Sequence, residues 1–548
     1  MTVKYGSIIA LFCLLLLPSW AWAVTYYVDA TDGSDVAAGT STETAWQTIE
    51  KINDYAEVTG FANGDTIKFQ REETWTGDET LGYDASAHFI DFGIAGLTFE
   101  DYGSGALPFF DGDSQQPINI RDDTLSNLTI KNIDVSGQGW QVGKSTNVFI
   151  REVSGVVIDG LYLNGHVGSD YNGKNGITLG ALPDGEDELG CSGTVEIKNC
   201  TVFNLGPETI PSVVLDFVGL VVIDQNSGTL SIHDNTVHTI NDDGIQLYHN
   251  LAATTLYDND LYNCGEQPID IKSSSNITVY DNEIYRTAGF TGLGGITDPP
   301  DCIEIHDTAD LETMTTIVVR NNDIHCGNGV GIRVMDNMAE VEIYNNEFTD
   351  SVGGIWVYRE AINVSIHHNL FHNGADDCLK IGISTADGAT LTAVYNNVFY
   401  ECDESIIVEE AAWSAENDQN LFKNNISINP DNYHVKSIES ILSNTFDYNS
   451  YYPDTGTLFY LVDTAYNFTD WKTQTSQDAN SITSDPVVSS TSDFHLQNTS
   501  PCIDTGTDVS LTTDYDGVAI PQGAGVDRGA YEYLSATIQG CTITGGVH

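Results

Sequence analysis

The chain has 548 residues, of which 79 are acidic and 20 are basic, and its formal net charge at pH 7 is −59. No segment carries enough lysine and arginine to bind nucleic acid or an anionic membrane by counterion release, so the composition excludes both as partners. Ten cysteines in a chain of this length are too few for a disulfide-built scaffold.

Residues 1–23 have the pattern of a signal peptide. Lys4 precedes an apolar run over residues 8–18, and the sequence Ala-Trp-Ala at residues 21–23 is a small-x-small cleavage pattern. The run is too short to span a membrane as a helix, and no later stretch is long and apolar enough to do so. We therefore expect a secreted or periplasmic protein without a membrane span.

The mature chain begins with features of a cap for one end of a solenoid. After a predicted strand that begins near Thr25, residues 45–55 place Trp46, Ile49 and Ile52 on one face of a short helix. A solenoid leaves its first coil open, and a helix placed before that coil would cover the exposed apolar end.

Between residues 241 and 384, six short segments repeat one pattern. Their central apolar residues are mostly 23 to 24 residues apart, with two longer steps of 34 and 29 residues. Each repeat holds several short strands and no helical pattern, which predicts one coil of a solenoid with parallel strands. Strand side chains alternate between two faces, so residues two positions apart face the same way. The predicted inward-facing residues are Ile245, Ile269, Ile303, Ile332, Ile355 and Leu379, followed by Leu247, Ile271, Ile305, Val334, Val357 and Ile381.

An alternating apolar run that ends in asparagine also recurs once per coil. Asparagine tolerates left-handed backbone, and its amide can hydrogen-bond an identical amide in the next coil. We therefore predict a stacked asparagine ladder at one turn. Its members are Asn235, Asn259, Asn282, Asn322, Asn346, Asn369 and Asn397.

Five cysteines recur at repeat positions. Cys302 and Cys378 directly precede the repeated strand, and Cys264, Cys326 and Cys402 lie at the turn after the asparagine. These positions favour small buried residues, and one or two pairs could be oxidised in an exported protein.

The opening segment and the asparagine-ended repeats resemble secreted bacterial right-handed parallel β-helix proteins of the pectate-lyase-like superfamily. The resemblance implies an all-β fold, a single-stranded right-handed parallel β-helix, over residues 24–482 including the N-terminal cap. Residues 483–534 resemble a C-terminal segment common in such proteins and are expected to form a second cap, followed by a tail at residues 535–548. We expect a monomer.

The positions between the inward residues face outward and form two files along successive coils. Three of the few basic residues, Lys272, Arg333 and Lys380, lie in these files, and Arg359 follows the end of its strand. A face that is only solvated would not be expected to gather acids, bases and aromatic residues in this way. An ion-pair ladder that only neutralises like charges is the structural alternative. The files are Gln246, Asp270, Glu304, Arg333, Trp356 and Lys380, and then Tyr248, Lys272, His306, Met335, Tyr358 and Gly382.

Carboxylates gather on the same face. Outward acids on consecutive coils are about 4.8 Å apart, and carboxylates this close either share a proton or bind a hard cation such as Ca²⁺. We predict that Ca²⁺ is the cofactor and that Asp242, Asp243, Asp270 and Glu304 are its ligands.

The resemblance and these residues together favour a calcium-dependent polysaccharide lyase, which cleaves an acidic, uronate-containing polysaccharide by β-elimination. Calcium-dependent lyases of this superfamily use outward acids followed by Lys and Arg one or two coils later. We predict Lys272 as the base, with its pKa lowered by nearby cations, and His306 as its rival. Arg333 would bind the substrate carboxylate or stabilise the charged intermediate. The predicted sugar-binding residues are Tyr248, Trp356, Tyr358, Arg359 and Lys380.

Two other functions fit the pattern. Residues 376–378 (Asp-Asp-Cys) and 242–244 (Asp-Asp-Gly) resemble motifs of polygalacturonase-like β-helix hydrolases, although the Gly-His-Gly and Arg-Ile-Lys motifs of that family are absent. Such hydrolases hold their carboxyls about 5 Å apart for retention or about 6.5 to 9.5 Å apart for inversion. A non-catalytic surface or adhesion β-helix protein is the third hypothesis, and the acidity favours it.

Overall fold

The structure of the chain is a computed structural model. It describes residues 22–76, 80–82, 93–111, 116–136, 145–165, 174–180, 190–206, 217–287, 290, 301–307, 314–336, 338–359, 361–372, 377–382, 391–409, 419–438 and 443–535. Nearly all of the predicted signal peptide and of the tail lies outside the described residues.

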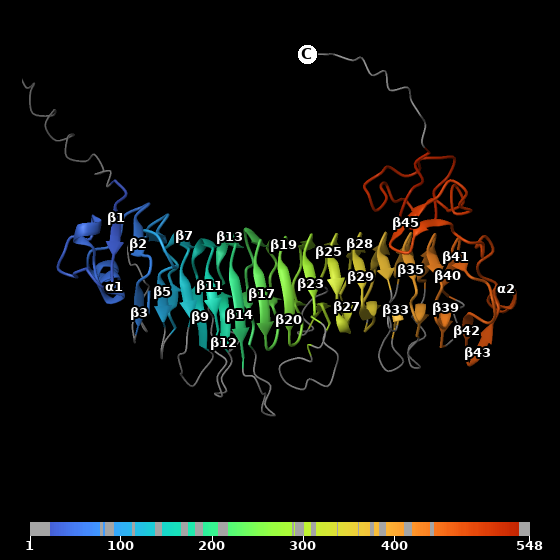
Figure 1. Cartoon of the computed structure of the whole chain (residues 1–548), viewed down its shortest axis with the longest axis horizontal. Coiled ribbons are helices and arrows are strands. Elements are labelled where there is room, and N and C mark those ends of the chain that lie inside the picture. Colours follow the sequence, from blue (N-terminus) through green and yellow to red (C-terminus); the bar gives the residue numbers. More distant parts are fainter. Residues whose placement is uncertain are drawn as a thin grey trace, which may run out of the picture.

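The described strands form three long sheets that run along a rod of stacked coils (Figure 1). Sheet A has 15 strands: β1 (Thr25–Val28), β2 (Thr66–Gln70), β4 (Thr98–Tyr102), β7 (Ser126–Lys131), β10 (Ser154–Asp159), β13 (Ser192–Lys198), β16 (Thr229–His233), β19 (Ala253–Tyr257), β22 (Ile277–Tyr280), β25 (Ile317–Arg320), β28 (Val341–Tyr344), β31 (Ser365–His367), β34 (Ala393–Tyr395), β37 (Leu421–Lys423) and β40 (Thr445–Asp447). Sheet B has 14: β3 (Thr74–Thr76), β5 (Phe109–Asp111), β8 (Asp134–Ser136), β11 (Tyr162–Asn164), β14 (Thr201–Leu205), β17 (Thr236–Ile240), β20 (Asp260–Cys264), β23 (Glu283–Tyr285), β26 (Asp323–His325), β29 (Glu347–Thr349), β32 (Leu370–His372), β35 (Val398–Tyr400), β38 (Ile426–Ile428) and β41 (Ser450–Tyr452). Sheet C also has 14: β6 (Ile118–Arg121), β9 (Ser145–Arg151), β12 (Lys174–Leu179), β15 (Leu220–Ile223), β18 (Ile245–Tyr248), β21 (Ile269–Lys272), β24 (Ile303–His306), β27 (Gly327–Met335), β30 (Ser351–Val357), β33 (Asp377–Ile381), β36 (Glu404–Val408), β39 (Tyr433–Ser437), β42 (Phe459–Leu461) and β43 (Thr464–Tyr466). The remaining elements are η1 (Thr42–Thr44), α1 (Ile49–Val58), α2 (Phe468–Thr475), β44 (Val488–Ser490) and β45 (Asp493–Leu496).

Each coil contributes one strand to each sheet, and the strands of successive coils pair in parallel, as in β18 with β21 and β21 with β24. Only the end pair β42 and β43 is antiparallel within sheets A to C as described. This arrangement confirms the predicted parallel β-helix. No helix in the described part of the chain is long and apolar enough to cross a membrane.

The interior of the rod is filled by the residues that the alternation predicts to face inward. None of the twelve inward residues listed above is more than 2% exposed, and they belong to one continuous apolar core. The β-branched isoleucine and valine that dominate these positions suit the pleated backbone of a strand. Burial of each such side chain contributes about 1.5 to 3 kcal/mol.

The asparagine ladder is present and is longer than predicted. The Nδ2 of Asn235 donates to Oδ1 of Asn259 at 3.0 Å, and the same bond repeats from coil to coil. The ladder continues through Asn425 to Asn449. The left-handed backbone lies at the residue before each ladder asparagine, as at Asp258 with φ 53° and Asn345 with φ 55°, because that residue makes the bend.

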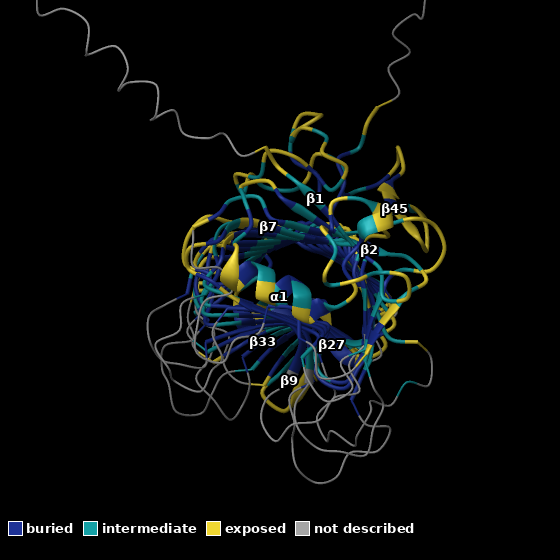
Figure 2. Cartoon of the chain, turned by 90° about the vertical axis from the view of Figure 1, so that its left-hand side faces the viewer, coloured by how far each residue is buried: buried dark blue, intermediate teal, exposed yellow. Residues whose placement is uncertain are grey.

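Helices close both ends of the core. α1 crosses the N-terminal opening, as the view along the rod shows (Figure 2). Its residues Ile49 and Ile52 are buried, as is Trp46 shortly before it. It begins at Ile49 rather than Ala45, because the side chain of Thr48 accepts a hydrogen bond from the Lys51 amide and caps the helix there. At the other end α2 packs Phe468 and Trp471 against the last coils.

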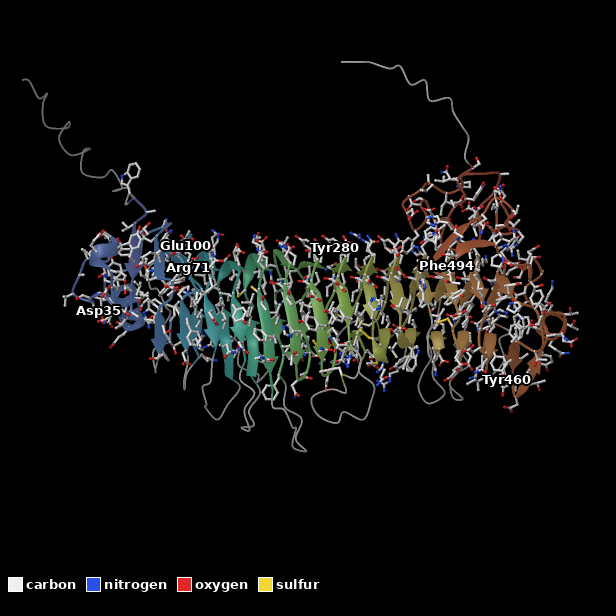
Figure 3. The ribbon with its side chains drawn as sticks, viewed as in Figure 1. Asp35, Arg71, Glu100, Tyr280, Tyr460 and Phe494 are labelled. Atoms are coloured by element: carbon white, nitrogen blue, oxygen red, sulfur yellow. A yellow bond between two sulfur atoms is a disulfide. The ribbon has the colours of Figure 1, made fainter. Side chains whose placement is uncertain are left out.

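Residues 484–534 do not cover the end of the rod but pack on its outer side. Phe494, in β45, lies against His372 and Tyr400 on the outer face of sheet B (Figure 3). Several consecutive coils of sheet B carry apolar residues at positions that face outward. The C-terminal segment covers these apolar residues. The side-chain amide of Asn424 donates to the Thr507 carbonyl at 2.8 Å and holds the segment in place.

Candidate functional site

The outward face of sheet C carries the predicted files, and the strand register aligns them. Successive strands from β18 to β33 pair so that outward residues of neighbouring coils lie side by side. The first file runs from Gln246 through Asp270, Glu304, Arg333 and Trp356 to Lys380. The second begins with Tyr248, Lys272, His306 and Met335.

Asp270 lies at the centre of this face and is only 1% exposed. Its Oδ2 lies 2.6 Å from Nζ of Lys272, and its Oδ1 lies 3.1 Å from Nε2 of His306. The side-chain amide of Gln246 donates to Oδ2 at 3.2 Å. Burial alone would raise the pKa of Asp270, but His306 and Lys272 outweigh burial and lower this pKa. Asp270 is therefore an ionised carboxylate that holds an imidazole and an ammonium side by side.

Asp243 is the second buried carboxyl of the site. The Gln246 amide donates to its Oδ2 at 2.8 Å, the backbone N–H of Gln267 donates to its Oδ1 at 3.2 Å, and Nζ of Lys272 lies 4.0 Å from Oδ2. Burial raises the pKa of Asp243 well above its usual range, and the carboxylates of Asp270 and Asp242 raise it further. The two carboxyls share one amide and one ammonium, and their environments shift their pKa values in opposite directions, upward for Asp243 and downward for Asp270.

Lys272 is held in its protonated form. Burial alone would lower the pKa of this amine, but the carboxylates of Asp243 and Asp270 outweigh burial and raise the pKa above its ordinary value. A catalytic lysine base requires a lowered pKa. The pKa of Lys272 is instead raised, so its amine is protonated at neutral pH.

Sheet A carries a similar group of one carboxylate, one lysine and one histidine, which differs from the Asp270 group in its exposure to solvent. Glu196 lies 2.8 Å from Nζ of Lys198 and 3.1 Å from Nε2 of His233, two residues that are also neighbours in adjacent coils. The Glu196 side chain is 28% exposed, whereas that of Asp270 is 1% exposed and has a second carboxyl beside it. Solvent screens the exposed trio, and the buried trio keeps its electrostatic coupling.

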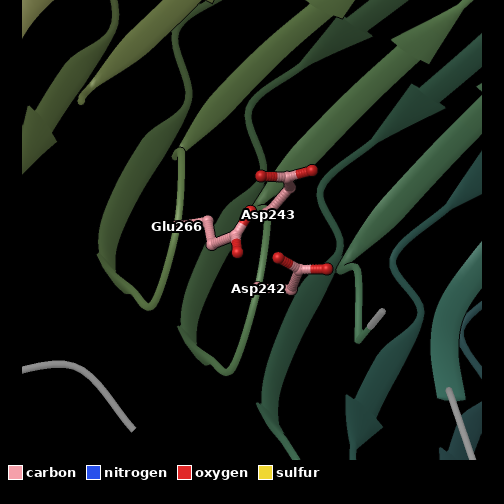
Figure 4. Close-up of side chains that lie close together, drawn as sticks. All are labelled: Asp242, Asp243 and Glu266. Atoms are coloured by element: carbon pink, nitrogen blue, oxygen red, sulfur yellow. The ribbon is translucent and has the colours of Figure 1, made fainter. Parts of the chain in front are cut away.

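Three carboxylates on this face could hold a metal ion. One ligand oxygen from each of Asp242, Asp243 and Glu266 lies within 4.8 Å of the other two (Figure 4). Three carboxylates supply oxygen donors with a net negative charge, which suit Ca²⁺, so the residues fit the ion.

The two other predicted calcium ligands are outside that group. Asp270 is engaged by Lys272 and His306, and Glu304 accepts a hydrogen bond from the Gln267 amide at 2.5 Å. Glu266 takes their place, and sequence reasoning missed it. Glu266 has the same position in its repeat as Asp242, three residues before the central isoleucine, so an alignment of the repeats could have found it.

Arg333 lies one coil beyond Glu304 and has a buried acid as its partner. Its Nη2 donates to Oδ1 of Asp301 at 2.9 Å, and its Nε lies 2.7 Å from Oδ2 of the same carboxyl. Burial raises the pKa of Asp301 to about 7, and Arg333 opposes this shift. Asp301 was not among the predicted residues, although it stands two residues before its central isoleucine, as Asp243 does.

The predicted sugar-binding residues are spread along this face. Trp356 is half-buried between two cations, with the Arg333 guanidinium 5.8 Å and Nζ of Lys380 5.1 Å from its ring centre. Tyr358 is buried beside Arg359, which is half-exposed, so the Trp356 ring rather than the Tyr358 ring is available to a ligand. Tyr248 lies at the other end, stacked on His249 at 3.9 Å and packed against a separate apolar cluster.

Two disulfides join cysteines at the repeat positions noted in the sequence. Cys302 pairs with Cys326, and Cys378 pairs with Cys402. Cys264 lies at the equivalent turn and is a buried free thiol, because the facing pre-strand position in its coil is a glycine, Gly244.

A family model described as the right-handed β-helix region matches residues 189–371 and 315–470, which together cover more than half of the chain. The chain belongs to this right-handed β-helix family. The match confirms the predicted right-handed parallel β-helix. A search of curated proteins found no match to the β-helix protein.

Several solved structures have a similar backbone arrangement at low sequence identity. The lacto-N-biosidase from Eubacterium ramulus has 15% identity and a TM-score of 0.46, with 64% of this chain and 64% of that enzyme covered. The β-helix protein thus spans less than two thirds of that enzyme. Pectate lyase Pel9A has 11% identity and a TM-score of 0.35, covering 94% and 97% of the two chains. PfbA, a surface adhesin of Streptococcus pneumoniae, has 11% identity and a TM-score of 0.40, covering 76% and 92%.

Proposed function

We propose that the β-helix protein is a polysaccharide lyase that cleaves an acidic, uronate-containing polymer by β-elimination on the outer face of sheet C. The observation that carries this proposal is the placement of His306 and Lys272 on the two oxygens of one buried carboxylate, Asp270. β-Elimination needs a base to remove a proton and an acid to protonate the leaving oxygen. These two neighbouring side chains supply the pair.

His306 is the base in this proposal. Asp270 is ionised and faces Nε2 of His306, so the carboxylate accepts the Nε2–H hydrogen bond and leaves the Nδ1 lone pair as the basic site. Nδ1 takes the proton from C5 of the uronate, the electron pair forms a double bond between C4 and C5, and the C4–oxygen bond breaks. Lys272, which the sequence predicts as the base with His306 as its rival, has the wrong protonation state for this step because its pKa is raised.

Lys272 is the acid. Its ammonium is partly exposed, whereas Asp270 and Asp243 beneath it are buried, so a polymer on this face would meet the amine first. The ammonium gives its proton to the leaving oxygen as the C4–oxygen bond breaks. Asp243 and Asp270 hold the amine in place and restore its preference for the charged form.

The negative charge of the uronate must be neutralised before its C5 proton becomes acidic enough to remove. Arg333, in the same file as Asp270, would bind the substrate carboxylate. Asp242, Asp243 and Glu266 would hold Ca²⁺, which would supply further positive charge for the substrate carboxylate when bound. The ring of Trp356 would stack on a sugar next to the cleaved bond.

A glycoside hydrolase is the second candidate, and one observation favours it. The environments of Asp243 and Asp270 push their pKa values apart, which is the arrangement that hydrolases use for a general acid and its partner carboxylate. Both oxygens of Asp270 are already engaged by Lys272 and His306, however, which favours the elimination. A non-catalytic binding protein is the third candidate.

One assay separates the three. Polygalacturonate, alginate and other uronate polymers are incubated with the protein, with Ca²⁺ or with EDTA, and the ultraviolet absorbance of the unsaturated product and the number of reducing ends are followed. Both signals together identify a lyase, reducing ends alone identify a hydrolase, and polymer binding without either signal identifies a binding protein. His306→Ala and Lys272→Ala should abolish the lyase signal, and Lys68→Ala, at a sheet A ion pair with Glu100, should not change it.

A further inference from the structure

The pair formed by Asp301 and Arg333 has an asymmetric exposure. The Asp301 side chain is 1% exposed and the Arg333 side chain is 18% exposed. A ligand on sheet C can therefore touch the guanidinium but not the carboxyl behind it. Asp301 can therefore affect ligand binding through Arg333, the exposed partner of the pair.

Asp301 contacts only one edge of the guanidinium. Its Oδ1 accepts a hydrogen bond from Nη2 at 2.9 Å, and its Oδ2 lies 2.7 Å from Nε without a hydrogen bond between these two atoms. Nε and Nη2 form one of the two edges of the guanidinium that can face a carboxylate. The other edge, formed by Nη1 and the outer N–H of Nη2, has no hydrogen-bond partner among the described residues. The guanidinium carbon lies 5.8 Å from the ring centre of Trp356 and 6.0 Å from that of Tyr358. The buried carboxyl thus fixes the plane of the guanidinium and leaves its outer edge for a second anion.

The backbone around this pair is cross-linked. Cys302, which follows Asp301, is bonded to Cys326, which directly precedes the strand that carries Arg333. The backbone N–H of Cys302 also donates to the Val330 carbonyl at 2.8 Å. The disulfide and this bond tie together the two coils that contribute the acid and the base, so their relative position is held independently of the ion pair.

A related arrangement, with the acid and the base on one strand, lies at β33, three coils beyond β24. Asp377 precedes Cys378, which is bonded to Cys402, and Nζ of Lys380 lies 3.9 Å from Asp377 and 3.1 Å from Glu409. Arg333 and Lys380 are the neighbours of Trp356 on the two adjacent coils, and each lies near its ring. Arg333 and Lys380, the two cations beside the Trp356 ring, thus each lie close to a buried acid, Asp301 or Asp377, that precedes a disulfide-bonded cysteine.

We infer that Asp301 is a positioning residue that aims the outer edge of Arg333 at a carboxylate of the substrate. This inference rests on the proposed function, because the carboxylate belongs to the uronate polymer. It assigns no proton transfer to Asp301. Loss of the acid would leave Arg333 charged but free to rotate, and an unfixed guanidinium pays an ordering cost each time it binds.

A double-mutant cycle tests the inference with tetragalacturonate and tetramannuronate as probes, by isothermal titration calorimetry. Asp301→Asn keeps the size of the side chain, and we expect it to raise Kd about tenfold for the probe that the wild type binds. Arg333→Gln should raise Kd by at least as much. The double variant should bind no more weakly than Arg333→Gln alone, because the acid acts through the arginine.

The control is Asp101→Asn, which releases Arg71 from a comparable pair on sheet A and should leave Kd unchanged. Circular dichroism and Tm show whether each variant is folded, and Asp301→Ser provides a second test if the asparagine variant is not. Equal affinity of Asp301→Asn and wild type, or additive effects in the double variant, would overturn the inference and leave the proposed function intact. Failure of the wild type to bind either probe would overturn both.

Discussion

Asp270→Asn is the most direct test of the proposed chemistry. The substitution keeps the size of the side chain but removes the charge that Lys272 contacts at 2.6 Å and His306 contacts at 3.1 Å. An amide can also present its N–H₂ group to His306, which would favour the wrong tautomer of the base. Since acid and base each contribute about 10²- to 10⁴-fold, and since a misoriented histidine alone costs up to about 10⁴-fold, we expect kcat to fall about 10³-fold.

The same substitution should cost little stability. Removing one partner of a buried ion pair usually costs about 3 to 5 kcal/mol, because the other charge is left without compensation. Here Lys272 keeps Asp243 at 4.0 Å, and the repulsion between two neighbouring carboxyls disappears. We therefore expect the free energy of unfolding to fall by about 1 to 2 kcal/mol, within the stability of a folded protein.

The assay is the initial rate of unsaturated product formation at saturating polymer, with Tm measured on the same samples. The matched control is Glu196→Gln, which removes a carboxylate from between a lysine and a histidine on sheet A. It should leave the rate unchanged, because that trio lies on another face. A rate for Asp270→Asn within tenfold of the wild type, or an equal fall for Glu196→Gln, would refute the assignment of this trio as the catalytic centre.

Three further predictions follow from the geometry. Ca²⁺ at about 100 times its Kd should stabilise the folded state by about 2.7 kcal/mol and so raise Tm. The double variant Asp242→Asn, Glu266→Gln should lose this rise in Tm. An unchanged rise in the variant would place the ion elsewhere. Burial lowers the pKa of His434 to about 4. Its contribution to stability is therefore complete above the unfolded pKa of about 6.5 and is lost as the pH falls from there to about 4. In denaturant titrations at several pH values, His434→Gln should reduce the dependence of the unfolding free energy on pH in this range. An unchanged pH dependence would exclude this histidine as its cause. Phe494→Ala should release residues 484–534 to limited proteolysis at a cost of about 3 to 5 kcal/mol, with sheet C activity retained, and unchanged protease resistance would show that other contacts hold the segment.

The periodicity of the chain was sufficient to predict its architecture. Repeats of 23 to 24 residues with several short strands admit a solenoid coil and no βαβ unit, and the period-2 alternation assigns each side chain to the core or to the surface. The asparagine ladder follows in the same way, because a residue that recurs once per coil is stacked on itself. These features are properties of one repeat and its neighbour, so no distant contact was needed to infer them.

The chemistry of the outer face depended on distances that a repeat pattern does not contain. Asp270, Glu304 and Asp243 lie on one face, but their contacts depend on the reach of each side chain. Asp270 contacts Lys272 and His306, whereas Glu266 lies with Asp242 and Asp243 in the cluster that could hold a metal ion. A pKa responds to burial and to charges a few ångströms away, so the protonated state of Lys272 could be assigned only once both carboxyls had been located around it.

The position of the C-terminal segment also required the folded chain. Sequence resemblance predicted a cap, whereas the structure covers the end of the rod with α2 and lays residues 484–534 along sheet B. The apolar outward residues of β32, β35 and β38 are visible in the sequence as breaks in the alternation. The segment that covers these residues is far from them in the chain. Its position depends on the fit between its surface and the outer face of sheet B, which forms only when the coils stack.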